Sequence, residues 1–285
     1  SGRNGLGIEF FDIVSGGTTK EFGIYSAART NTSGCGNAVR SLSASGYNGS
    51  GTLGSSNEIE YVTPASAGNP IDFGDRTSTG YGGQATSSST RGLFWGNREP
   101  NTNIIDYVEI PTLGNAVDFG DTPYNNGYKG AAQSPTRGYV AGARGPSGNN
   151  SSDIQVVTFS SKGNSVKFGD LTSDRSDNVT GASNSTTGIF SIGNNTGMTD
   201  PGGSAVRQID KLNLASSGNA VSFGELNKDR HRCGGASNQT RAIFAGGFTS
   251  PGTFAYSSGI DSVTIASSGN GVDFGEMSPK GQYGA

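Results

Sequence analysis

Acidic side chains recur at one fixed place in the sequence, directly after a Phe-Gly pair. Two carboxylates in different environments can act as a general acid and a general base, and several together can hold a metal ion. Repetition gives these side chains similar environments instead. It therefore favours a repeated turn contact, made with an Arg eighteen residues after the Phe or with backbone N–H groups. The five acids are Asp75, Asp121, Asp170, Glu225 and Glu276.

Three copies of this motif read Asp-Phe-Gly, which is also a magnesium-binding motif of protein kinases: 72–74, 118–120 and 273–275. Kinase chemistry further needs a Gly-rich phosphate loop, a strand Lys and a catalytic-loop Asp. The sequence has none of these, and a catalytic motif would not repeat. We therefore expect no catalytic residue, no metal, no cofactor and no enzymatic activity.

Other metal ligands and nucleophiles are few. His231 is the single histidine, in the segment Asp229-Arg-His-Arg, where we expect an exposed loop. Cys35 and Cys233 fall in repeats that are not neighbours, whereas a disulfide needs Cα atoms within about 7 Å. We expect both to be small buried thiols.

Trp95 is the one tryptophan, and it stands where the other repeats have Ala or Ser. One interpretation is that it fills a wider gap between two repeats. The other is that it forms a stacking platform, for example for a sugar ring. The sequence leaves both open.

The composition excludes several classes of protein. The 285 residues include 48 Gly, only 31% are hydrophobic and 15% are charged, and the net charge is −3. Fourteen Phe and ten Tyr still provide a core, so disorder is not expected. No stretch approaches the ~18 apolar residues of a membrane span, so no membrane insertion is expected. The acidic balance without a Lys/Arg cluster argues against nucleic acid.

A repeat organises the whole chain. Each copy carries Phe-Gly, with an Ile fourteen residues before the Phe, and five of the copies place Gly-Asn between the two. A constant spacing in every copy is not an accident of composition. The copies are centred on Phe22, Phe73, Phe119, Phe168, Phe223 and Phe274.

Each copy predicts four short strands joined by turns. In the second full copy, for example, these are 83–86, 92–95, 105–110 and 116–119, with Gly114-Asn115 as a turn. Four strands per ~50 residues are typical of a propeller blade. We therefore predict an all-β fold: a six-bladed β-propeller of four-stranded antiparallel blades, forming a single domain over 1–285. The closing blade is expected to be irregular and shared by the two termini.

One face of this propeller is expected to carry function. The turns between strands 1 and 2 of a blade, and between strands 3 and 4, are short and uniform. The loops between strands 2 and 3, and those from strand 4 to strand 1 of the next blade, vary (2–3 and 4–1 loops). Variable loops on a rigid frame are where binding sites usually lie. Together with Trp95, the residues that we expect to contact a ligand are Arg98, Tyr124, Tyr128, Arg144, Arg207 and His231.

The order of elements resembles the kelch repeat: a small-residue strand, then a strand ending in Gly-Gly such as Gly246-Gly247, a third strand, and a fourth with an aromatic residue. Phe-Gly stands where that family has Trp, and Arg29, Arg175 and Arg230 fall near its Arg. This resemblance implies architecture and no particular activity.

The motif Ile-Asp-Tyr-Val, followed by Gly-Asn-Ala-Val-Asp-Phe-Gly-Asp, resembles repeats in structural proteins of tailed phages, including phages that infect cyanobacteria. The resemblance implies a virion protein of the extracellular particle, in a tail fibre or appendage, that binds other virion proteins and a host surface glycan or protein. Three alternatives stay open: a purely architectural propeller, a carbohydrate-active enzyme of the glycosidase kind, and a cellular kelch-like adaptor.

Overall fold

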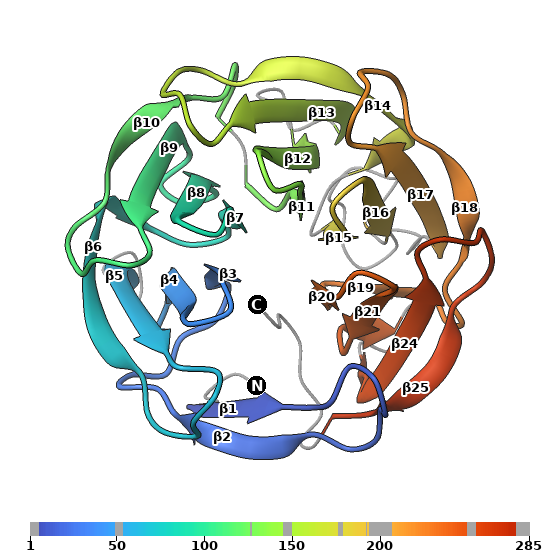
Figure 1. Cartoon of the computed structure of the whole chain (residues 1–285), viewed down its shortest axis with the longest axis horizontal. Coiled ribbons are helices and arrows are strands. Elements are labelled where there is room, and N and C mark those ends of the chain that lie inside the picture. Colours follow the sequence, from blue (N-terminus) through green and yellow to red (C-terminus); the bar gives the residue numbers. More distant parts are fainter. Residues whose placement is uncertain are drawn as a thin grey trace.

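The computed structural model describes residues 6–48, 54–125, 127–144, 150–175, 179–191, 193, 207–249 and 255–277, and within these the chain forms strands and no helix. Four-stranded sheets stand side by side in a ring around a central channel (Figure 1). All strand pairings within the sheets are antiparallel. This confirms the prediction of an all-β propeller with four-stranded antiparallel blades.

Each blade runs from its innermost strand at the channel to its outermost strand at the rim. Blade 1 comprises β3 (Ser33–Gly36), β4 (Ser41–Tyr47), β5 (Ser55–Val62) and β6 (Ile71–Gly80). Blade 2 comprises β7 (Gln84–Ser87), β8 (Arg91–Asn97), β9 (Thr102–Glu109) and β10 (Val117–Asp121). Blade 3 comprises β11 (Gly130–Gln133), β12 (Arg137–Arg144), β13 (Asn150–Thr158) and β14 (Val166–Arg175). Blade 4 comprises β15 (Thr180–Ser183), β16 (Thr187–Ser191), β17 (Gln208–Asn213) and β18 (Val221–Glu225). Blade 5 comprises β20 (Gly234–Ser237), β21 (Arg241–Ala245), β24 (Gly259–Thr264) and β25 (Val272–Glu276).

The prediction of six blades is wrong: the described residues form five. Between blades 5 and 1 lies only a two-stranded sheet of β1 (Gly7–Phe10) and β2 (Lys20–Ile24) (Figure 1). Within the described residues, the first repeat copy therefore forms only the two outer strands of a blade. The strand that we expected the C-terminus to add to this sheet falls in 278–285, outside the described residues.

A small additional sheet lies beside blade 5. It consists of β19 (Arg230–His231), β22 (Phe248–Thr249) and β23 (Ala255–Tyr256). Its strands come from two connecting segments: β19 lies in the link between blades 4 and 5, and β22 and β23 lie in the loop between β21 and β24.

A β-bulge explains the constant spacing of Ile and Phe. In blade 1, Ile59 pairs with Gly74 and Glu60 with Asp72, so Phe73 is the extra residue of the fourth strand. The same register shift recurs in the other copies. The bulge leaves the Phe unpaired in the ladder, and Phe73 is 2% exposed. The constant spacing therefore reflects the register of this hairpin, which places the Phe of each copy at the bulge.

Neighbouring blades are joined at the rim by the Phe-Gly and Gly-Asn motifs. The N–H of Gly114 in blade 2 donates to the carbonyl of Phe73 in blade 1 at 2.9 Å. The Asn115 side-chain oxygen accepts from the N–H of Asp75 at 3.0 Å. The Gly-to-Phe bond also closes the ring, because Gly17 donates to the Phe274 carbonyl at 3.3 Å. The two motifs are thus the two halves of one inter-blade joint.

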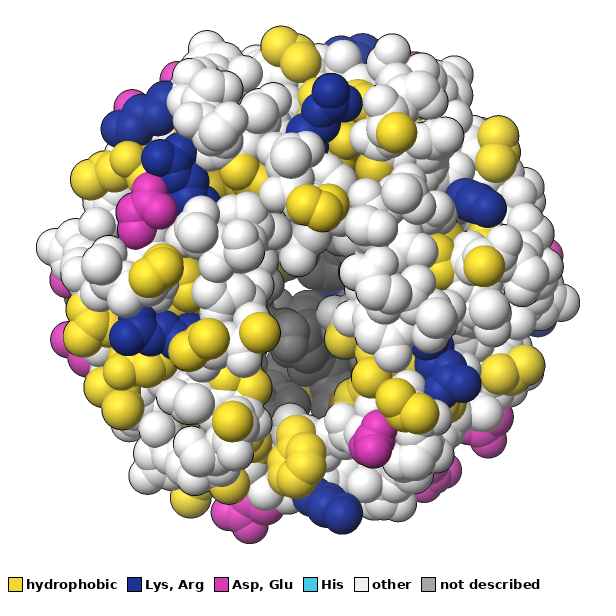
Figure 2. Space-filling view, viewed as in Figure 1, with side chains coloured by type: hydrophobic (Ala, Val, Ile, Leu, Met, Phe, Trp, Pro, Cys, Tyr) yellow, Lys and Arg dark blue, Asp and Glu magenta, His cyan; other side chains and the backbone are white. Residues whose placement is uncertain are grey.

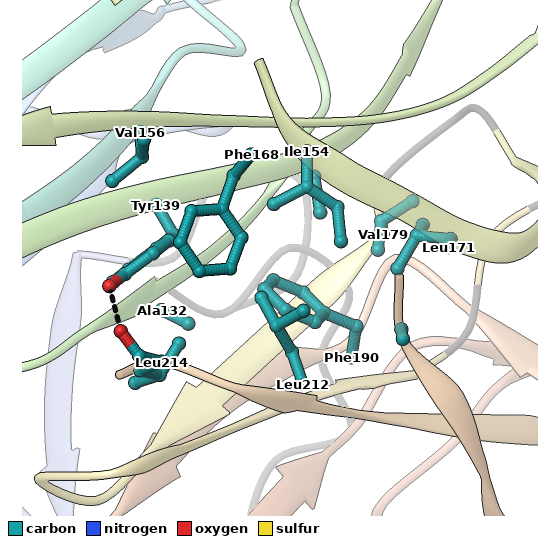
Figure 3. Packing of buried hydrophobic residues seen from close by; sticks show 12 residues of the cluster. Ala132, Tyr139, Ile154, Val156, Phe168, Leu171, Val179, Phe190, Leu212 and Leu214 are labelled. Atoms are coloured by element: carbon teal, nitrogen blue, oxygen red, sulfur yellow. Dashed lines mark hydrogen bonds between the residues drawn. The ribbon is translucent and has the colours of Figure 1, made fainter. Parts of the chain in front are cut away.

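The hydrophobic core lies between blades rather than within them. One cluster combines Tyr139, Ile154 and Phe168 of blade 3 with Phe190 and Leu212 of blade 4, all buried (Figure 3). Equivalent clusters fill the spaces between the other consecutive blades. Each blade buries its faces only against its neighbours, so stability depends on the closed ring.

Buried ion pairs cross four of the boundaries. The segment that leads into a blade supplies an Arg, and the residue after the repeat Ile supplies the acid. Arg76 pairs with Asp106 at 2.9 Å and Arg175 with Asp210 at 2.9 Å, and all four side chains are fully buried. The other two pairs are Arg230 with Asp261 at 2.5 Å and Arg29 with Glu60 at 3.6 Å. Blade 3 differs, because Gln155 occupies the acidic position.

Candidate functional site

Aromatic and charged side chains gather where the links between blades 1, 2 and 3 meet, on the face of the variable loops. We call this group the Arg98 cluster: Tyr47, Tyr81, Arg98, Glu99 and Tyr128. Tyr47 ends β4, and Tyr81 lies in the link from β6 to β7. Arg98 and Glu99 follow β8, and Tyr128 lies in the link from β10 to β11.

Contacts run through the whole cluster. The rings of Tyr47 and Tyr81 lie 5.2 Å apart between centroids, tilted by 50°. The Tyr81 hydroxyl donates to Glu99 Oε2 at 2.9 Å, and Arg98 Nη1 lies 3.7 Å from the same oxygen. The Arg98 guanidinium carbon lies 5.2 Å from the centroid of Tyr128, a cation–π arrangement. Arg98 is thereby held between a carboxylate and an aromatic face.

Backbone hydrogen bonds fix the segments that carry these side chains. Arg98 N–H donates to the Tyr81 carbonyl at 2.8 Å, and Tyr128 N–H donates to the Gly82 carbonyl at 2.8 Å. Gly82 has φ +69°, and a Cβ there would lie 2.9 Å from the Tyr128 ring. At Gly127 a Cβ would lie 2.6 Å from the Arg98 Cβ. These two glycines permit the close approach of the three segments.

Part of the cluster is open to solvent. The side chains of Arg98 and Glu99 are 31% and 56% exposed, Tyr47 and Tyr81 are half-buried, and Tyr128 is buried beneath Arg98. Burial, together with the hydrogen bond to Glu99, raises the pKa of Tyr81, so its hydroxyl stays protonated as a donor. An aromatic surface beside a guanidinium and a carboxylate can stack on a sugar ring and hydrogen-bond its hydroxyls.

Trp95 lies in the core and offers no open face. It is 0% exposed, and its Nε1–H donates to the Thr86 hydroxyl at 2.8 Å. Its neighbours include Ile105 of blade 2 and Val140 and Phe159 of blade 3. The stacking interpretation does not fit this burial, because a ligand cannot reach the ring. The gap-filling interpretation does.

The remaining candidates are distributed around the ring. The Tyr124 hydroxyl donates a hydrogen bond to the carboxylate of Asp153 in blade 3. Burial raises the pKa of Tyr124 to about 12, and the nearby Asp153 carboxylate contributes to the rise. Arg207 precedes β17 and pairs with Asp229 at 3.0 Å and Glu225 at 3.5 Å. His231 is half-buried in β19, opposite Phe248, rather than in an exposed loop. Arg144 ends β12, and its side chain lies outside the described residues.

Among the described residues, no carboxylate after Phe-Gly pairs with the Arg eighteen residues after the Phe, so that one of the two expected contacts is wrong. The backbone N–H groups of Asp75, Asp121, Asp170 and Glu225 donate to the Asn side chain of the next blade, as Asp121 N–H does to Asn164 at 3.0 Å. The Asp170 carboxylate pairs with Lys167 at 2.9 Å. Among the described residues, no group of three or more His, Cys, Asp and Glu side chains could hold a metal ion. Cys35 and Cys233 are both free thiols.

The central channel is a second hollow. The innermost strands line a cavity of about 230 Å³ with small and polar residues, among them Thr32, Gln84, Gln133, Thr180 and Ser237. Figure 2 shows its mouth at the centre of one face. Hydrogen bonds link the inner strands around it: Ser87 N–H donates to the Gln133 side chain at 2.8 Å, and Gln133 N–H to Ser183 at 2.9 Å. No charged side chain is among the described residues that line it.

Comparisons with known proteins support the fold. The solved structure of YjhT, which has a β-propeller-type fold, superposes with a TM-score of 0.67 at 12% identity, covering 87% of this chain and 86% of that chain. Together with the blade arrangement, this supports a kelch-like β-propeller. No family model and no curated protein matches the sequence. In the described part of the chain no helix is long and apolar enough to cross a membrane.

Sequence reasoning found Arg98 and Tyr128 of the cluster, and it missed Tyr47, Tyr81 and Glu99. The sequence did contain a signal. Tyr47 lies at the start of one of the variable loops between strands 2 and 3 of a blade, and Glu99 lies within another. Tyr81 follows β6, in a segment that links strand 4 of one blade to strand 1 of the next. The sequence did not show how the blades are arranged in the ring. That arrangement places the β8–β9 loop between the β6–β7 link and the β10–β11 link.

Proposed function

We propose that this chain is a non-enzymatic binding propeller of a tailed-phage virion, placed in a tail fibre or appendage, which contacts the host surface through the Arg98 cluster. The observation that carries the binding role is the half-exposed Tyr47–Tyr81 pair beside Arg98 and Glu99. The virion setting rests on the resemblance of the repeats to tailed-phage structural proteins. The partners proposed are other virion proteins and a host surface glycan or protein receptor.

The experiment is binding of the purified chain to intact candidate host cells and to a glycan array. We expect saturable binding that Tyr81→Ala and Arg98→Ala each weaken by about tenfold or more, as truncation of central aromatic and Arg anchors does. Leu113→Ser is the control, because Leu113 is 55% exposed in the β9–β10 turn of the same blade, at the other end of the strands. It should leave binding unchanged.

Two outcomes would overturn parts of this proposal. If the folded chain binds neither cells nor glycans, the architectural alternative replaces the adhesive one, and the partner to seek is another virion protein. If the chain releases reducing sugar from host polysaccharide, the non-enzymatic assignment is wrong. The effects of Tyr81→Ala and Arg98→Ala are compared only if both variants unfold at the same temperature as the parent chain.

A further inference from the structure

A groove of about 700 Å³ lies between blades 3 and 4, on the side of the molecule that carries the short turns. Its cationic lining residues are Arg137, Lys162 and Lys167, and its hydroxyl groups include those of Ser161, Ser216 and Ser217. No Asp or Glu is among the described residues that line it. In Figure 2 a dark-blue side chain over blade 3 lies without magenta beside it, whereas one over blade 2 touches magenta.

The Arg at this repeat position has a fixed structural role in other blades. Arg91 of blade 2 donates to the Phe159 carbonyl of blade 3 at 2.7 Å, pairs with Glu109 at 2.7 Å and lies 4.9 Å over the ring of Tyr107. Arg40 likewise donates to the Ile110 carbonyl at 2.6 Å and lies over Tyr61. Arg241 donates to the Ile13 carbonyl at 2.9 Å and lies over Phe274.

Arg137 of blade 3 has lost all three kinds of partner. Val156 replaces the aromatic ring of Tyr107, and Thr158 replaces the carboxylate of Glu109. The equivalent carbonyl, that of Leu214, accepts from the Tyr139 hydroxyl at 2.5 Å (Figure 3). The half-buried Arg137 guanidinium consequently makes no hydrogen bond, ion pair or ring contact with the described residues.

We propose that this groove binds a carboxylate-bearing saccharide, such as a uronic acid chain, with its carboxylate on Arg137. A guanidinium presents a planar fork of N–H donors that matches a carboxylate. Blade 2 shows the same geometry satisfied internally, since Glu109 there supplies the carboxylate that Thr158 cannot. The ligand carboxylate therefore occupies the position that Glu109 has in blade 2.

The rest of the groove suits a saccharide better than an acidic peptide. Lys162 lies 4.9 Å over Tyr107, and Lys167 is held between Asp153 at 2.8 Å and Asp170 at 2.9 Å, so Arg137 is the cation left to pair with the ligand. Serine hydroxyls line the opposite wall and can exchange hydrogen bonds with sugar hydroxyls. An acidic peptide carries no comparable set of ring hydroxyls, so it could not exchange these hydrogen bonds with the serines.

The test is calorimetric titration of the full chain with trigalacturonate, and with its methyl ester as the matched neutral probe. We expect binding of the acid only, weakening as salt is raised. Arg137→Gln should weaken it about tenfold to a hundredfold, the cost of a charge-assisted contact. Thr158→Glu should weaken it as much while leaving Arg137 in place, because the new carboxylate competes for the guanidinium.

Two variants distinguish this site from others. Arg91→Gln removes an equivalent but already paired cation and should leave binding intact, provided that the variant unfolds at the same temperature as the parent. Tyr81→Ala removes part of the Arg98 cluster and should also leave it intact, so failure here and failure of the proposed function are separate results. The proposal is overturned if the methyl ester binds equally, if Arg137→Gln or Thr158→Glu retains binding, or if a Glu-rich peptide of equal charge binds more tightly than the saccharide.

Discussion

The backbone N–H of Gly68 in blade 1 donates to the carbonyl of Phe22 in β2, 2.9 Å away. This bond lies at one of the boundaries of the two-stranded sheet, and Gly17 to Phe274 lies at the other. The N-terminal copy therefore makes the same rim joint as a complete blade on both of its sides. The ring is closed at its rim even though the inner half of the sixth position is not formed by the described residues.

The first prediction concerns this joint. A Cβ on Gly23 would lie 2.1 Å from the Gly68 carbonyl oxygen, which is closer than real atoms approach. Gly23→Ala should therefore push the two sheets apart and lower the free energy of unfolding by about 1–3 kcal/mol. Chemical denaturation monitored by circular dichroism measures the loss.

Gly68→Ala is the matched control within the same joint. A Cβ on Gly68 has no atom within 4 Å, and neither glycine has a positive φ. The control should change stability by less than about 0.5 kcal/mol. Equal losses in the two variants would show that replacing a glycine anywhere in this joint, rather than the contact between Gly23 and Gly68, causes the effect.

The second prediction concerns the buried ion pairs between blades. Asp210 and Arg175 are fully buried and 2.9 Å apart. Asp210→Asn leaves the guanidinium without its counter-charge in the interior, so we expect a loss of about 3–5 kcal/mol. The control is Asp229→Asn, which removes a carboxylate that pairs with Arg207. Both side chains of this pair are 46% exposed, so the substitution should lower the free energy of unfolding by less than about 1 kcal/mol. Comparable losses would contradict the assignment of Arg175–Asp210 as a structural pair.

The sequence predicted the blades well because the signals are local. The strand hairpins, the Gly-Asn turns and the Ile-to-Phe register all lie within one repeat copy, and the prediction of four antiparallel strands is confirmed. The number of blades was wrong for a physical reason. The first copy contains the rim motif, so it counts as a repeat, yet residues 7–24 form only the two outer strands.

The site was less predictable because it depends on contacts between copies. The sequence left open whether Trp95 fills a gap between repeats or forms a stacking platform, and only the neighbouring blade, which covers the ring, decides between them. Arg137 reads as one more repeat Arg, and only the bond from Tyr139 to Leu214 shows that its carbonyl partner is taken. Such facts depend on which side chains of the next blade meet the residue, and a single copy does not encode them.

The third prediction uses Trp95 as a reporter. Since it is the single tryptophan and is fully buried, its fluorescence should be blue-shifted and poorly quenched by acrylamide, and both should revert on unfolding. Trp95→Ala should cost about 3–5 kcal/mol of stability through the cavity that it leaves. Trp95→Phe should cost less, about 1–2 kcal/mol, mainly from the unpaired Thr86 hydroxyl. Strong quenching in the native protein would place the ring at the surface and restore the stacking interpretation.

The last prediction concerns Lys129, which is 3% exposed at the entrance to blade 3 and whose Nζ has no hydrogen-bond partner among the residues that the structure describes. Burial lowers the pKa of this amine to about 7, from 10.5 in the unfolded chain. Above pH 7 the folded protein holds the neutral amine while the unfolded chain still binds the proton. The free energy of unfolding therefore rises with pH in this window, approaching about 1.4 kcal/mol per pH unit.

Lys129→Met isolates this effect, because the difference between the parent chain and the variant cancels the other titrating groups. The variant should be the more stable protein at pH 7, and its advantage should shrink as the pH rises from 7 to 8.5, measured by urea denaturation at fixed ionic strength. Cys35 and Cys233, whose pKa values burial raises to about 12, ionise earlier in the unfolded chain and lower the stability of both proteins at higher pH, so their effect also cancels in this difference. A pH-independent difference between the two proteins would mean that Lys129 stays protonated in the fold, with its charge compensated by another group.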